Sequence, residues 1–125
     1  MRTRPVLALL LLAGCFGPDR PVRPDFAQVT DPDQRVPAIR FLTADEVARR
    51  LDELAAVAAS DPTPRVRDQI VLRLKKWGQP QAIPVLRTIY RDDANWEVAD
   101  AALDALIAVC RHHHGPLPPD APPAG

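Results

Sequence analysis

The chain has 125 residues, and its 16 basic and 16 acidic side chains give no formal net charge. No long run of Lys and Arg interrupts this balance, which argues against a nucleic-acid partner, because binding along a phosphate backbone relies on clustered positive charge. The length suffices for one small domain, and prolines gathered toward both ends reduce the part of the chain that is able to fold.

The first residues have the pattern of a secretory signal. Arg2 and Arg4 precede an apolar run over residues 6–13, which is far shorter than the roughly 20 residues of a membrane-spanning helix. Residues 12–15, which read LAGC, resemble the lipobox of bacterial lipoproteins.

The lipobox resemblance implies that residues 1–14 are a signal peptide and that Cys15 carries a diacylglyceryl lipid as the first residue of the mature protein. Several acyl chains hold a protein stably at a membrane. Retention at the inner membrane goes with Asp after the lipidated Cys, and here Phe16 follows it. The resemblance therefore favours the outer membrane, with the domain facing the periplasm. An ordinary signal peptide with a chance Cys is the alternative.

Residues 15–42 are predicted to be a tether without secondary structure. Five spaced prolines oppose a helix and weaken a strand, namely Pro18, Pro21, Pro24, Pro32 and Pro37. The last part, residues 36–42, is apolar. We expect Ile39, Phe41 and Leu42 to lie against the first helix and cover one end of the domain. The alternative is a short segment that a partner protein recognises.

Four helices are predicted after this tether, over residues 44–59, 64–77, 82–91 and 95–111. Thr43 and Glu46 indicate a capping box at the first start, Pro64 suits the second start, and Gly78 ends the second helix. Apolar spacing then predicts which positions face the core. They are Val47, Leu51, Leu54, Ala55, Ala58, Val66, Ile70, Leu74, Trp77, Ile83, Leu86, Tyr90, Ala99, Ala102, Leu103, Leu106 and Cys110.

An internal repeat relates the second and fourth helices at an offset of 32 residues. It aligns Asp61 with Asp93, Val66 with Val98, Asp68 with Asp100 and Leu74 with Leu106. A period of this length indicates stacked helical units. Because a helix stop and a helix start lie between the two copies, each unit is an antiparallel helix pair, and the predicted fold class is all-α.

Residues 77–109, which read WGQPQAIPVLRTIYRDDANWEVADAALDALIAV, resemble a HEAT repeat of the short bacterial type. The resemblance implies two stacked antiparallel helix pairs over residues 43–111, a fragment of an α-solenoid. It also implies a platform that holds other proteins. The residues themselves show no pattern that supports catalysis or a cofactor.

The two aligned helices carry opposite charge, the second being basic and the fourth acidic. In HEAT proteins such helices lie side by side on the concave face, so we expect two patches of opposite sign that orient a protein partner. The candidate partner-binding residues are Arg65, Asp68, Gln69, Arg73, Lys76, Glu97, Asp100 and Asp104.

The polar residues near the C-terminal end predict neither a metal site nor catalysis. His112, His113 and His114 are adjacent at a helix end and point in different directions, whereas zinc needs three or four converging ligands. Cys110 is expected to be a buried free thiol, which is unreactive. Residues 112–125 are rich in Pro and are expected to be disordered.

Two functions are compatible with these patterns. The first is a binding module that recruits a periplasmic or envelope protein. The second is a structural subunit that stacks with a partner or with itself to complete a larger envelope assembly. Neither needs nucleic acid or a small-molecule substrate.

Trp77 and Trp96 lie at helix boundaries and are expected to seal the ends of the core, with a ligand box as the alternative.

Overall fold

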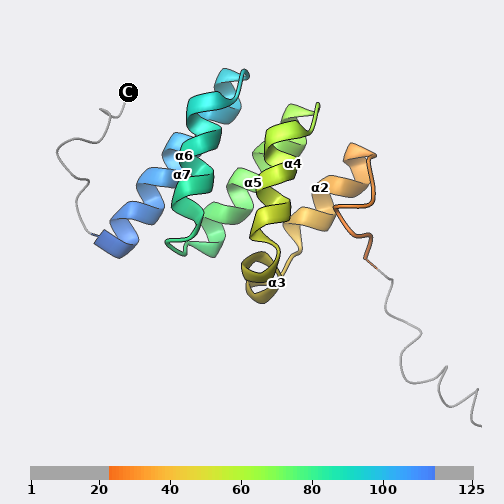
Figure 1. Cartoon of the computed structure of the whole chain (residues 1–125), viewed down its shortest axis with the longest axis horizontal. Helices are drawn as coiled ribbons and strands as arrows, with labels where there is room; N and C mark the ends of the chain where they lie inside the picture. The colour runs from red at the N-terminus through yellow and green to blue at the C-terminus, as the bar shows by residue number, and fades with distance from the viewer. Residues whose placement is uncertain (1–22, 115–125) are drawn as a thin grey trace, which may run out of the picture.

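The computed structural model describes residues 23–114, and within them all regular structure is helical (Figure 1). The helices are α2 (Pro32–Arg40), α3 (Ala44–Arg49), α4 (Leu51–Ser60), α5 (Pro64–Trp77), α6 (Ala82–Asp92) and α7 (Trp96–His114). The all-α prediction is confirmed. The predicted signal peptide and Cys15 lie outside the described residues, as does the tail beyond residue 114.

The helices form two layers. In one layer α5 lies between α2 and α7 and contacts both, and in the other α4 lies beside α6 (Figure 1). The pairs α4/α5 and α6/α7 are antiparallel, as the repeat predicts. The short α3 leads into α4 at an angle, at the edge where α2 ends.

The 32-residue register extends one offset, and so one helix, further toward the N-terminus than the internal sequence repeat indicated. Leu42, Leu74 and Leu106 occupy equivalent places at successive offsets, and all three are buried. So are Ala38, Ile70 and Ala102. The layer of α2, α5 and α7 therefore contains three copies of the second helix of the repeat, and the array has two and a half units where two were predicted.

The prediction that residues 15–42 are a tether is wrong for residues 32–40, which form α2. The Asp31 side chain caps this helix by accepting from the backbone N–H of Asp33, and Pro32 stands in the first turn, where proline costs nothing. Pro37 removes one hydrogen bond from the helix. Burial of Val36, Ala38 and Ile39 in the core offsets that loss.

The apolar segment at the end of α2 covers α5, not the first predicted helix. Ile39 and Leu42 are buried as expected, but Phe41 is 61% exposed. Phe41 follows the last residue of α2 and points away from the core, so its prediction as a covering residue is wrong.

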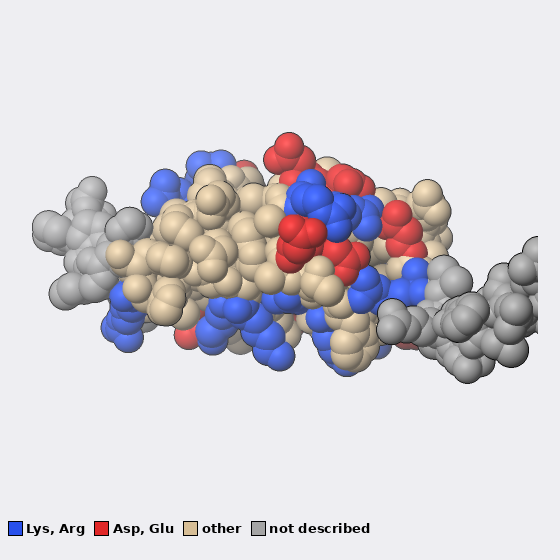
Figure 2. All heavy atoms as spheres, turned by 90° about the horizontal axis from the view of Figure 1, so that it is seen from below, with Lys and Arg blue, Asp and Glu red and all other residues tan. Residues whose placement is uncertain are grey.

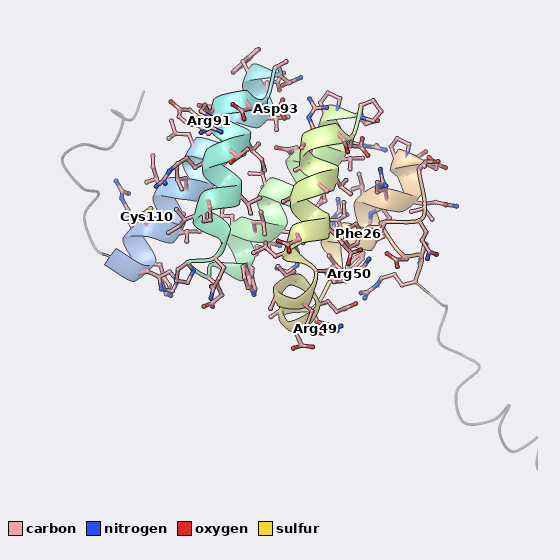
Figure 3. All side chains as sticks on the ribbon, viewed as in Figure 1. Phe26, Arg49, Arg50, Arg91, Asp93 and Cys110 are labelled. Atoms are coloured by element: carbon pink, nitrogen blue, oxygen red, sulfur yellow. The ribbon has the colours of Figure 1, made fainter. Side chains whose placement is uncertain are left out.

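A break at Arg50 divides the first predicted helix into α3 and α4. Arg50 has φ −115° and ψ 23°, outside the helical range. Its guanidinium lies 4.2 Å from the ring centroid of Phe26 and donates to Asp25 Oδ1 at 2.7 Å. Figure 3 shows Arg50 directed toward Phe26. The break thus lets α3 turn aside while Arg50 anchors residues that precede α2.

The predicted helix boundaries hold at three places. The capping box of Thr43 and Glu46 is present, Pro64 stands in the first turn of α5, and Gly78 ends α5 in the left-handed conformation at φ 68°. The left-handed φ explains why glycine occupies that place.

The core-facing stripe of α7 differs from the prediction. Val98, Ala102, Ala105, Leu106 and Val109 are buried, whereas the predicted Ala99, Leu103 and Cys110 are half-buried. The helix packs against both α5 and α6, so its buried stripe is centred between them. On the other helices most predicted positions are buried, with Leu51, Ala55, Trp77, Ile83 and Tyr90 half-buried.

Ile39→Ala tests whether α2 belongs to the folded domain. Ile39 is 0% exposed, so removing its branched side chain leaves a cavity and should lower the free energy of unfolding by about 2–5 kcal/mol. Phe41→Ala, two residues away at an exposed position, is the matched control and should change it by less than about 0.5 kcal/mol. Equal midpoints for both variants in urea unfolding would show that α2 is not part of the core.

Candidate binding groove and charged faces

A buried ion pair joins each repeat unit to the next. Arg35 on α2 binds the carboxylate of Asp61 in the turn after α4, and its Nε donates to the backbone oxygen of Phe26 at 2.7 Å. The second carboxylate oxygen of Asp61 accepts from the backbone N–H of Thr63 at 2.8 Å. The Asp61 side chain is almost fully buried, so all of its charge is met by protein groups.

The same arrangement recurs one unit later with Arg67 and Asp93. Arg67 Nε and Nη2 donate to the two carboxylate oxygens of Asp93 at 2.7 and 3.1 Å, and Nη1 donates to the backbone oxygen of Asp61 at 2.8 Å. Asp93 Oδ1 accepts from the N–H of Asn95 at 2.9 Å. Burial raises the pKa of Asp93, but Arg67 and this N–H outweigh burial and hold the pKa below its usual value.

A groove of about 780 Å³ separates α4 from α6. The wall on α4 is made of small side chains, among them Ala55, Ala58 and Ala59, and the wall on α6 includes Val85 and Ile89. The remaining lining residues are Leu51, Asp52, Asp61, Arg67, Gln81, Pro84, Thr88, Asp92, Asp93 and Ala94. The Arg67–Asp93 pair thus also lines the groove, which is mostly apolar with carboxylates around it.

The groove was missed by sequence reasoning. Ala55 and Ala58 were predicted to lie in the apolar stripe of a core helix, and their small size was not interpreted. Small residues on one wall leave space that larger ones would fill, so the signal was the run of alanine at residues 55–59, interrupted once by Val57.

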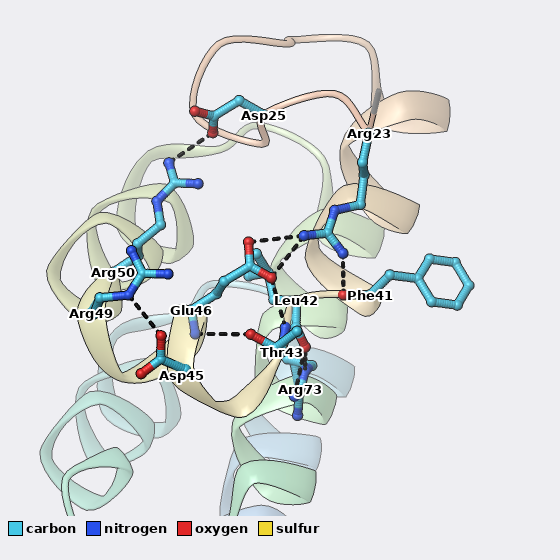
Figure 4. Close-up of polar contacts among 10 residues, drawn as sticks. All are labelled: Arg23, Asp25, Phe41, Leu42, Thr43, Asp45, Glu46, Arg49, Arg50 and Arg73. Atoms are coloured by element: carbon cyan, nitrogen blue, oxygen red, sulfur yellow. Dashed lines mark hydrogen bonds and ion pairs between the residues drawn. The ribbon is translucent and has the colours of Figure 1, made fainter. Parts of the chain in front are cut away.

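Two of the predicted partner-binding residues have structural tasks. Gln69 is buried and accepts from Arg40 Nη2 at 3.3 Å. Arg73 donates from Nε and Nη2 to the backbone oxygen of Leu42 at 2.9 and 2.7 Å (Figure 4). Both side chains hold α2 and the residues that follow it against α5, and their contact with a partner stays a prediction.

The other predicted residues are exposed or half-buried on the layer of α2, α5 and α7. Arg65 pairs with Asp33 at 2.6 Å, and Asp104 pairs with Lys75 at 2.6 Å, so part of the predicted charge is used between neighbouring helices. Burial, followed by the charge of Glu97, raises the pKa of Asp68. Lys76, Glu97 and Asp100 are exposed.

Charge on this layer separates along the helix axes more than between helices. Exposed basic side chains gather where the helices end, at Arg40, Lys75, Lys76 and Arg111. Figure 2 shows Lys and Arg along one edge of that end, with acidic and basic groups mixed nearer the middle. Cations at helix C-termini are favoured by the helix dipole. The expected contrast in charge between a basic α5 and an acidic α7 is therefore weaker than predicted. Basic side chains gather at the C-terminal ends of all three helices, and ion pairs between neighbouring helices neutralise part of the remaining charge.

Residues 23–29 close the end of the array beside α2. Phe26 is 0% exposed under Arg50, and Arg23 donates to Glu46 at 2.8 Å and to the backbone oxygen of Phe41 (Figure 4). The backbone N–H of Thr43, followed by Arg23, lowers the pKa of Glu46 to about 2. These contacts replace the helix that would precede α2 in a longer array.

Cys110 and the histidines lie near the end of α7. Among the described residues no three His, Cys, Asp or Glu side chains converge on one point. The rings of His112 and His113 stack edge to face with centroids 4.7 Å apart, and His113 contacts the backbone oxygen of Gly78. Cys110 is a free thiol, half-buried where full burial was expected (Figure 3).

The profile of the HEAT repeats family matches residues 25–107. The chain therefore belongs to the HEAT repeat family, and the match includes α2, as the structural register does. No curated protein and no solved structure gave a match in the other two comparisons. Within residues 23–114 no helix has the length and apolar character needed to span a membrane.

Arg67→Met tests the link between the repeat units. Removing the guanidinium leaves the Asp93 carboxylate buried without its partner, which should cost about 3–5 kcal/mol of unfolding free energy. Arg65 lies on the same helix as Arg67 and forms an exposed pair with Asp33 of α2. Arg65→Met breaks this pair and should cost no more than about 1 kcal/mol of unfolding free energy. Calorimetry of both variants checks this difference, and equal costs would contradict a structural role for the buried pair.

Proposed function

We propose that the chain is a lipid-anchored lipoprotein of the bacterial envelope, facing the periplasm at the outer membrane, which binds another protein without catalysing a reaction. Membership of the HEAT repeat family supports the scaffold role, since such repeats serve as helical platforms for other proteins. The observation that carries the proposal is the open groove between α4 and α6.

The groove has the properties of a site for an apolar segment of a partner. Alanine on α4 allows the backbone of a bound helix or extended peptide to approach closely, while Val85 and Ile89 on α6 offer apolar contact. Asp52 is exposed at this site, so it favours a basic residue in the partner segment. The groove is already open in the chain alone, so binding needs no rearrangement of the repeats.

The anchor rests on residues 12–15, and the described domain begins only eight residues after Cys15 begins the mature chain. At about 3 Å for each extended residue, these residues span roughly 25 Å. The proposal thus limits the domain to a shorter maximum distance from the membrane surface than the predicted tether of residues 15–42 would give.

A structural role is the second candidate, and the open side of α7 favours it. Residues 23–29 cover the first end of the array, whereas α6 and α7 have no further repeat beside them within the described residues. A partner with its own repeats could continue the stack at this side.

Cys15→Ala tests the lipid anchor. If Cys15 is the lipidation site, the variant should incorporate no labelled fatty acid and should accumulate as an uncleaved precursor, because both modifications act at this residue. Processing and label uptake are followed by gel electrophoresis of cells grown with the labelled fatty acid. Incorporation at the level of the unchanged chain would rule out the anchor.

Ala55→Phe tests the groove. Ala55 lines it and is half-buried, so a phenyl group fills the space that a partner would occupy. Ala56→Phe is the matched control, because Ala56 is exposed on the same helix and does not line the groove. Affinity capture from detergent-solubilised membranes should lose its specific partner at least tenfold with Ala55→Phe alone. Equal capture by the two variants would place the binding site elsewhere.

A further inference from the structure

The free side of α6 and α7 can be mapped from the repeat register. On α5 the residues facing α7 include Lys75, which pairs with Asp104, and Asp68, whose neighbour is Glu97. Adding 32 to residues 68, 71 and 75 gives the places on α7 that face away from α5. These are Asp100, Leu103 and Ile107.

This side carries more apolar surface than a helix against solvent needs. Val71 is 0% exposed on α5, while its equivalent Leu103 is only half-buried, as is Ile107. Trp96, at the start of α7, is 75% exposed. A large aromatic side chain beside half-buried apolar residues is the composition of an interface core.

The side of α6 that faces away from α4 is found in the same way. The groove-facing residues Leu51, Ala55 and Ala58 of α4 correspond to Ile83, Arg87 and Tyr90 of α6. Ile83 and Tyr90 are half-buried, and Arg87 is exposed. The free side therefore presents a positive charge on α6 and a negative charge, Asp100, on α7.

The residues on the free sides of α6 and α7 lie at similar positions along the helix axes when they are counted from the α6–α7 turn. This position along the axis is called the height below. Arg87 lies five residues before Asp92, the end of α6, and Asp100 lies four residues after Trp96, the start of α7. At about 1.5 Å per residue, the two charges stand at nearly the same level along the helix axes. Tyr90 and Trp96 match near the turn by the same measure. Ile83 falls at the level between Leu103 and Ile107.

We propose that this side binds a second copy of the chain about a two-fold axis parallel to the helices. Such an axis keeps heights and exchanges the layers, so α6 of one copy lies antiparallel to α7 of the other. Arg87 then meets Asp100 of the second copy, Tyr90 meets Trp96, and Ile83 meets Leu103 and Ile107. Every contact occurs twice by symmetry.

Two other arrangements fit less well. A two-fold axis across the helices would set α7 against α7 and α6 against α6, so Arg87 would no longer face Asp100 of the second copy. Head-to-tail stacking would need an open first end, but Phe26 and residues 23–29 cover it under Arg50. The unequal ends thus favour a closed pair over a growing filament.

A photoreactive amino acid at residue 103 of the full chain, cross-linked in its membrane, tests the contact. We expect a covalent dimer whose cross-link maps to residues 83–90 of the second copy. The same probe at Arg40, exposed on α2, is the control and should give no dimer. A cross-link to α7 of the second copy, to a different protein, or to nothing would overturn the proposal.

Charge exchange tests the orientation independently. Arg87→Glu and Asp100→Arg, both at exposed positions, should each weaken the dimer about tenfold in sedimentation of the detergent-solubilised chain, because two ion pairs become two repulsions. The combined variant should recover most of the affinity. Two additive losses without recovery would overturn the pairing. Partner capture through the groove should be unchanged, which separates this inference from the proposed function.

Discussion

The array depends on buried Arg–Asp pairs that connect each repeat unit to the next. An isolated carboxylate in the interior would cost several kcal/mol, so the pairs are tolerated only with complete hydrogen bonding. Arg67 supplies it by donating to both oxygens of Asp93 and to the backbone of the preceding turn. A buried carboxylate finds its hydrogen-bond donors in only one alignment of neighbouring units. These pairs therefore set the register between units more strictly than apolar packing does.

The pairs also explain why the helices within one layer pack more closely than the helices within the other. Each arginine comes from the layer of α2, α5 and α7 and reaches the turn that leads into the next helix of that layer. The layer is therefore closely packed, while α4 and α6 are joined mainly through the turns and through small side chains. The groove exists because the repeats are held together on one side and left apart on the other.

Local sequence signals predicted the later helices well but failed at the first unit. Capping by Thr43, Pro64 in a first turn and Gly78 at a helix end are short-range effects that need no tertiary contact. The helix α2 was missed because its prolines were counted as breakers. Only the structure shows that Pro32 lies in the first turn and that burial of Ile39 outweighs the bond lost at Pro37.

The candidate site was less predictable than the fold, for a related reason. The partners of Gln69 and Arg73 are Arg40, the last residue of the missed helix, and the backbone of Leu42, which directly follows that helix. The break at Arg50 depends on Asp25 and Phe26, about 25 residues earlier in the chain. Contacts between such distant segments leave no periodic signal in the sequence, and without them a structural charge cannot be told from a free one.

Native-state hydrogen exchange tests most directly whether residues 23–114 form one array linked through its buried pairs. The most protected amides of α2, around Ala38 to Arg40, should exchange with the same opening free energy as those of α5 and α7, because unfolding of any unit breaks the links to the others. Exchange of the α2 amides through an opening that costs about 2 kcal/mol less than that of α5 would contradict the account. The first unit would then be an appended helix outside the cooperative array.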